Sequence, residues 1–142
     1  MDPKDRLIKP YGKFYVPGDS IPADSVSLVE DVVEEGRLTV KPLMVGEEII
    51  FIEAFKGQGM VDPYHKHDDH ESVGYLLSGK LRLVIGDQEF IANPGDAWLH
   101  PRGVMHLSEA LEDSIQLEVK SPPRKTWYTD AELAERGEGP LA

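Results

Sequence analysis

Hydrophobic residues in this chain occur in short β-type runs that are separated by residues typical of turns. The runs span residues 38–45, 48–55, 73–77, 81–85, 89–92, 97–100, 104–107 and 114–119. Glycine, proline, asparagine and aspartate mark turns at 57–59, 62–63, 78–79, 86–87, 93–96 and 101–103. Short strands with turns at this close spacing predict an all-β sandwich or barrel.

Two of the runs show a clear alternation of apolar and polar positions. In residues 81–85 the odd positions are apolar and Arg82 lies between them, and in residues 114–119 the odd positions are again apolar. Side chains of a strand alternate between its two faces. We therefore expect the odd positions to be buried and the even ones, including Arg82, to face water.

The two ends of the chain differ from its centre. Residues 1–25 hold four prolines and two glycines, a composition that predicts an extended arm. Near the other end, Thr129 precedes an acidic first turn and Gly137 follows, which predicts a short helix with Thr129 as N-cap. The expected organisation is an N-terminal arm with edge strands (1–37), a β-barrel (38–120) and a tail with a short helix (121–142).

Length and composition narrow the possible functions. The chain has 142 residues, 40% of them hydrophobic and 29% charged, which suits one globular domain. A formal net charge of −11 disfavours nucleic acid or an anionic membrane as partner, and the absence of cysteine excludes thiolate chemistry. The charged N-terminus does not look like a secretory signal, and no apolar run approaches about 18 residues. We expect a cytoplasmic protein.

Histidines supply the candidate chemistry. His65 and His67 are two residues apart, so on a strand both imidazoles point to one face. His106 follows the turn at 101–103 and is able to approach them from another strand, whereas His100 is expected at the surface or the rim of the core. Three neutral imidazoles with open positions suit one divalent transition metal per chain: Zn, Mn, Fe, Ni or Cu.

The spacing of these residues resembles that of the cupin family, and in particular small single-domain bacterial cupins. Gly59, His65, His67 and Gly79 match the first cupin motif, and Gly95, Pro101, Gly103 and His106 match the second. The segment 80–94 between the motifs is short, as in compact family members. The resemblance implies a single double-stranded β-helix (jelly-roll) barrel in which His65, His67 and His106 bind the metal.

The sequence departs from the family pattern at the fourth ligand. Ser72 stands where the family has glutamate or glutamine, and Glu71 precedes it by one residue. Strand alternation turns Glu71 away from the face of Ser72 unless the strand is shifted or bulged. Glu71, His70 and water are therefore the alternatives for the fourth ligand.

Further residues are candidates for catalysis and for a substrate pocket. Glu71 or Tyr64 could carry a proton beside the metal. Trp98, Met105 and Tyr75 could line the pocket, Trp98 above all because its indole N–H needs a partner. For aromatic and methionine side chains on strands, ordinary core packing is the alternative.

The resemblance implies three possible functions. The first is a metal-dependent enzyme that acts on a small oxygenated substrate (a carbonyl, enol or sugar-acid-like compound) by Lewis-acid isomerase or lyase chemistry. The others are a dioxygenase that uses the same histidines with O₂ and a non-catalytic module that binds a small ligand or metal. Residues 121–127, Ser-Pro-Pro-Arg followed by an aromatic residue, resemble a segment that follows the barrel in many small bacterial cupins, including sugar-acid-processing ones. The family also implies a homodimer, formed through a sheet face or a swapped N-terminal strand.

Overall fold

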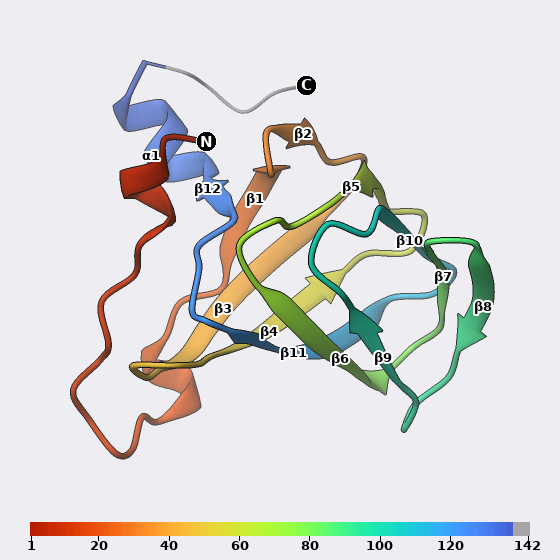
Figure 1. Ribbon diagram of the computed structural model, residues 1–142, viewed down its shortest axis with the longest axis horizontal. Coiled ribbons are helices and arrows are strands. Elements are labelled where there is room, and N and C mark those ends of the chain that lie inside the picture. The colour runs from red at the N-terminus through yellow and green to blue at the C-terminus, as the bar shows by residue number, and fades with distance from the viewer. Residues whose placement is uncertain (138–142) are drawn as a thin grey trace.

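Two facing β-sheets make up most of the molecule (Figure 1). The computed structural model describes residues 1–137; residues 138–142, the end of the expected tail, lie outside the described part. The larger sheet has the order β12-β1-β3-β4-β11-β6-β9, with β2 paired to β1, and the smaller has the order β5-β10-β7-β8. The pairings given for these strands are antiparallel, and the architecture is the expected all-β jelly roll.

The strands are β1 (Asp24–Val29), β2 (Val32–Val33), β3 (Leu38–Val45), β4 (Ile50–Lys56), β5 (Val61–His65), β6 (Glu71–Ser78), β7 (Leu81–Ile85), β8 (Gln88–Ala92), β9 (Ala97–His100), β10 (His106–Ala110), β11 (Ser114–Ser121) and β12 (Trp127–Thr129). A short helix α1 (Asp130–Glu135) follows β12, and two 3-10 turns (Pro3–Arg6 and Gly18–Ser20) lie in the N-terminal arm. Within residues 1–137 no helix is long and apolar enough to cross a bilayer.

Alternation in β7 follows the sequence prediction. Leu81 and Leu83 are buried in the core, while Arg82 points outward and pairs with Glu89 and Glu109. The core between the sheets also takes apolar side chains from β3 and β4. The inward-facing apolar side chains therefore pack between the smaller sheet and the larger one.

Strand β11 is oriented opposite to the prediction. Ser114, Gln116 and Lys120 are buried, whereas the apolar residues Ile115 and Leu117 are only partly buried and lie on the outer face. Alternation places residues on common faces but does not say which face points inward. Here the inner face lines a polar cavity, so the polar residues point inward and the expectation for 114–119 was wrong.

Strand β5 runs through Asp62 and Pro63, where the sequence predicts a turn. Pro63 instead lies in β5, at the edge of the smaller sheet, where a strand tolerates a residue without an N–H. The strand pairs with β10 and is bridged to Glu35 at its first residue, Val61; the pairing with β10 sets His106 opposite His65. This register brings the two cupin motifs together.

The predicted helix is present at the other end of the chain. The Thr129 hydroxyl accepts from the Glu132 N–H, and the Glu132 carboxylate accepts from the Thr129 N–H, a reciprocal capping box. At the N-terminal end, β1 pairs with β3 and β12 of the same chain, so the segment after the arm is an integral part of the larger sheet.

Candidate metal centre

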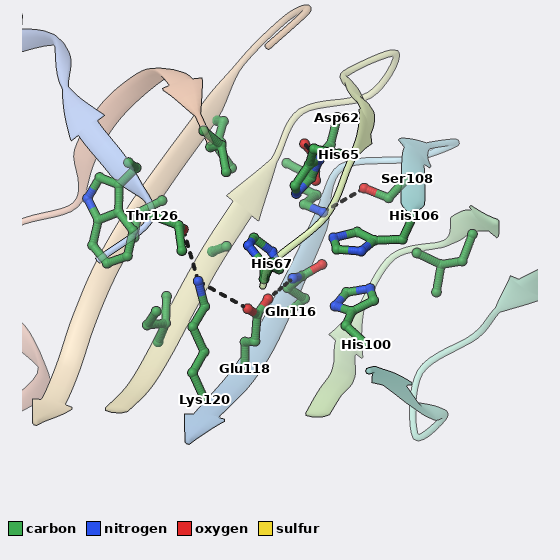
Figure 2. A pocket seen from close by; sticks show the side chains of 18 of the residues that line it. Asp62, His65, His67, His100, His106, Ser108, Gln116, Glu118, Lys120 and Thr126 are labelled. Atoms are coloured by element: carbon green, nitrogen blue, oxygen red, sulfur yellow. Dashed lines mark hydrogen bonds and ion pairs between the residues drawn. The ribbon is translucent and has the colours of Figure 1, made fainter. Parts of the chain in front are cut away.

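Three histidines converge at one end of the barrel. His65 ends β5, His106 begins β10 opposite it, and His67 follows in the loop after β5. One nitrogen from each ring lies within 4.8 Å of one from each of the others, and all three side chains are buried (Figure 2). The ring centroids of His65 and His106 are 4.3 Å apart. Three such nitrogens can hold a metal ion.

Each of these rings has its Nδ1 occupied. The His65 Nδ1 lies 2.8 Å from the Pro63 carbonyl, the His106 Nδ1 3.3 Å from the Val104 carbonyl, and the His67 Nδ1 2.6 Å from Glu30 Oε2. Since carbonyl and carboxylate oxygens only accept, each Nδ1 carries the proton. The lone pair of each Nε2 is then available to a metal, which is the arrangement that metal-binding histidines need.

Burial keeps the imidazoles of His67 and His106 neutral. It lowers the pKa of His106 to about 3, with the charge of His100 acting in the same direction. Burial is also the main cause that lowers the pKa of His67, followed by the positive charge of Lys120. A metal competes with protons for the same lone pair, so a low pKa favours metal binding near neutral pH.

A second layer of charged groups holds the His67 ring. Arg6, in the N-terminal arm, contacts both oxygens of Glu30 and both oxygens of Asp69. Glu30 accepts from His67, and Asp69 lies 2.8 Å from the His70 Nδ1. The arm thus orients a residue of the metal centre through a carboxylate.

The structure places the candidates for the fourth ligand differently. Glu71 is exposed, as alternation on an unbulged strand predicts, and Ser72 points inward with its Oγ 3.1 Å from the His100 Nδ1. His70 is fully buried against Asp69 but is not a member of the three-histidine group.

His100 corrects the expectation that it lies at the surface or rim. It is 7% exposed, lines the cavity and stacks on His106 with ring centroids 3.8 Å apart. Because β9 pairs with β6 so that His100 is opposite Ser72, both residues share the inner face. The side chains of Ser72 and His100 together occupy the space that a larger acidic side chain at position 72 would take.

The wall of the cavity includes charged residues that sequence reasoning did not single out. Gln116, Glu118 and Lys120 project from β11 and Lys56 from the end of β4 (Figure 2 labels the first three). The Gln116 amide donates to Glu118 at 3.0 Å, and Lys120 Nζ lies 3.5 Å from Glu118. Polar residues at every second position of an otherwise apolar strand were the signal available in the sequence.

The charge state of Glu118 follows from its neighbours. Burial favours the neutral acid, but the positive charges of Lys120 and, to a smaller extent, Lys56 outweigh it and hold the pKa of Glu118 below its usual range. Glu118 is therefore a carboxylate at neutral pH. The cavity, of about 60 Å³, thus presents an ionised acid together with the neutral imidazoles of His67 and His106.

The other predicted residues lie as follows. Trp98 is buried and lines the cavity, with its Nε1 lacking a hydrogen-bond partner. Tyr64 and Met105 are 48% and 44% exposed and border a separate surface hollow beside Arg6, and Tyr75 is 42% exposed on the outer face of β6. The structure does not bring Glu71 or these three residues into the cavity.

The comparison with known families agrees with this geometry. Residues 51–119 match the sequence profile described as a cupin domain, and this segment holds both histidine motifs. Residues 51–119 form a cupin domain. The pectin degradation protein KdgF of Dickeya dadantii (strain 3937) is 28% identical over 79 residues, which are 55% of this chain and 72% of that protein.

Solved cupin structures resemble this cupin as well. KdgF from Halomonas sp. is 27% identical, with a TM-score of 0.58 over 60% of this chain and 80% of that one. An RmlC-like cupin from Shewanella frigidimarina aligns over 78% of this chain and 92% of its own, with a TM-score of 0.68 at 18% identity. The latter likeness shows the fold alone.

Proposed function

We propose that this cupin is a metal-dependent enzyme that acts on a small, oxygenated, sugar-acid-like substrate by isomerase or lyase chemistry. The observation that carries the proposal is the buried three-histidine group with every Nδ1 engaged. A bound divalent metal would supply Lewis acidity at a carbonyl or enol oxygen. Glu71 and Tyr64, the proton carriers expected from the sequence, are exposed, and we therefore assign this role to Glu118.

Glu118 is suited to move a proton. Its carboxylate lies in the same cavity as the histidines and is ionised, so it can accept a proton from a substrate C–H or O–H. In an isomerisation, Glu118 returns that proton at a different atom, and the carboxylate is regenerated. Lys120 and Gln116 hold the carboxylate in place in both protonation states.

The substrate class rests on the relatives. Two similar proteins bear the name KdgF, and one of them is described as a pectin degradation protein. Pectin is a polymer of sugar acids, and the ring-opened or unsaturated products of its breakdown contain carbonyl and enol groups of the kind that a Lewis acid activates. We therefore place unsaturated and keto sugar acids first among the substrates to be assayed.

Elemental analysis of protein purified without added metal or an affinity tag tests the proposal. We expect near-stoichiometric metal in the parent and none in His106→Ala, while His100→Ala serves as the matched control and keeps the metal. Activity on sugar acids should then be lost in Glu118→Gln with metal content unchanged. Absence of metal from the parent, even after titration with divalent ions, would overturn the enzyme and favour a ligand-binding module.

The identity of the metal decides between the two enzymatic alternatives. Zinc or manganese with no O₂ uptake agrees with isomerase or lyase chemistry. Iron, nickel or copper with substrate-dependent O₂ consumption would replace that proposal by the dioxygenase alternative.

We also propose that the chain forms a homodimer through the outer face of the larger sheet. Val73, Tyr75 and Leu77 of β6 and Leu99 of β9 are exposed by 42–50%, and Val73 and Leu99 are direct cross-strand neighbours. Contiguous apolar surface of this kind is typical of protein interfaces. Light scattering should give twice the chain mass and Val73→Glu should give 15.8 kDa; a parent of 15.8 kDa would exclude the dimer.

A further inference from the structure

Lys56 occupies an inward-facing position of β4, and the other inward-facing positions of this strand are apolar. In β4 the inward positions are Ile50, Ile52, Ala54 and Lys56, and all four are buried. The Lys56 side chain is only 5% exposed and lines the same cavity as the three histidines. Its ammonium donates to the Ser108 Oγ at 2.7 Å, the bond drawn at Ser108 in Figure 2.

Within the described part of the chain, the charge of Lys56 has no contact partner of opposite sign. Among residues 1–137, no carboxylate oxygen lies within the 4.0 Å of an ion pair with its Nζ, whereas the other buried lysine of the cavity, Lys120, has Glu118 at 3.5 Å. Ser108 takes one of the three N–H donors of the ammonium. A buried cation that is left unpaired costs free energy, so its retention points to a partner supplied from outside.

Two nearby carboxyl groups, those of Glu34 and Asp62, do not supply the missing counter-charge of Lys56. Burial and the neighbouring Asp62 raise the pKa of Glu34 to about 10, so Glu34 keeps its proton at neutral pH. Asp62 lies 3.4 Å from the His65 Nδ1. Asp62 and the ionised Glu118 line the same cavity, and the charge of Lys56 helps to keep Glu118 ionised, but among residues 1–137 none of the three carboxyl groups makes an ion pair with Lys56.

Among residues 1–137, three further atoms of the cavity wall lack a hydrogen-bond partner: Trp98 Nε1, Gln116 Oε1 and Asp62 Oδ1, the last of which lies 3.4 Å from the His65 Nδ1. The Trp98 Nε1–H is a buried donor without an acceptor, and the Gln116 Oε1 is a buried acceptor without a donor. The Gln116 amide is oriented by its own donation to Glu118, which fixes Oε1 as the free end. Buried polar groups are normally paired, so the ligand should bring acceptors for Lys56 and Trp98 and a hydroxyl for Gln116.

We infer that Lys56 determines specificity by binding the carboxylate of a small hydroxy acid, whose hydroxyl donates to Gln116. The inference rests on the proposed function in that the acid would occupy the substrate cavity. It goes further because it names the residue that gives the site its preference for a negatively charged ligand. A cavity of about 60 Å³ accommodates the carboxylate and its adjoining carbinol group, and larger acids would extend beyond it.

The test uses three small probes and the metal-free full-length protein, so that it does not depend on metal binding. D-glycerate has the carboxylate and hydroxyls, D-glyceramide lacks the charge, and propionate lacks the hydroxyls. Amide shifts in ¹⁵N-labelled protein give the dissociation constants. We expect glycerate to bind about ten-fold or more tightly than glyceramide, the gain of a charge-assisted hydrogen bond, and more tightly than propionate.

Lys56→Met should remove the preference for glycerate over glyceramide, and Lys41→Met, the same change at a lysine that does not line the cavity, should keep it. The parent should show glycerate-dependent shifts at Lys56, Ser108 and Gln116, a readout that stands even if Lys56→Met does not fold. Equal affinities for glycerate and glyceramide, no binding of either, or a preference that survives in Lys56→Met would overturn the inference. Loss of metal binding with a retained preference would instead overturn only the proposed enzyme.

Discussion

Replacing Glu30 by alanine is expected to weaken metal binding although Glu30 is not a ligand. Its Oε2 accepts from the His67 Nδ1 at 2.6 Å and from Arg6 Nη2 at 3.1 Å, so one oxygen joins the arm to the ring. Without this acceptor the His67 ring loses both its fixed tautomer and its orientation. Removal of such supporting groups typically lowers metal affinity about 10- to 100-fold, or about 1.4 to 2.7 kcal/mol.

The measurement is a zinc titration against a chromophoric chelator at constant pH. Glu89→Ala is the matched control, because Glu89 also pairs with an arginine, Arg82, but at the surface and away from the histidines. Arg6→Met should weaken zinc binding in the same direction, since it removes the counter-charge of Glu30. If Glu30→Ala and Glu89→Ala bind zinc equally well, the idea that Glu30 orients His67 is refuted.

The remaining predictions concern stability. In the folded state the pKa values of His100 and His106 are lowered from 6.5 to about 4 and about 3. Between these lowered values and 6.5, the unfolded state therefore binds more protons than the folded state. The urea midpoint of the metal-free protein should therefore fall as the pH drops from about 6.5 to about 4, and a constant midpoint would contradict this. Glu34 acts in the opposite direction. Because its pKa is raised above the ordinary 4.5, the folded state holds an extra proton above that pH, and the free-energy cost of burying Glu34 grows as the pH rises. Glu34→Gln should raise the midpoint more at about pH 8 than at about pH 5, and equal changes at both would argue against a protonated Glu34. Gly74→Ala would set a Cβ 2.3 Å from the Trp98 ring and should cost about 1 to 3 kcal/mol while shifting the tryptophan fluorescence; an unchanged spectrum and midpoint would show that the close approach is relieved elsewhere.

The sequence was sufficient to predict the all-β fold and the convergence of His65, His67 and His106. Short runs with turn residues between them identify strands, and the match to two cupin motifs identified the three histidines. The i,i+2 spacing was not the reason for their convergence, because β5 ends at His65 and His67 lies in the loop that follows. The expected runs agree with most of the observed strands, although their ends differ by a few residues. Local patterns were enough for the strands, whereas the approach of His106 to His65 depends on the pairing of β10 with β5.

The inner wall of the cavity could not be predicted in the same way. Alternation in 114–119 was recognised, but the rule that apolar residues point inward fails where the interior is polar, so Gln116 and Glu118 were assigned to the wrong side. Lys56 reaches Ser108 across the interior, and no local pattern reports such a contact. His100 was misplaced for a related reason, since its face is set by the pairing of β9 with β6.

The N-terminal arm carries a consequence for how fast a metal ion is exchanged. Residues 1–23 contribute no strand to either sheet, and backbone bonds from Tyr11 to Val45 and from Lys125 to Arg6 tie them to the barrel. Segments held in this way open at much lower free energy than the whole domain. Each opening withdraws Arg6 from Glu30 and so loosens the support of His67 while the barrel stays folded. The off-rate of a bound ion would then follow the detachment of the arm, and not global unfolding.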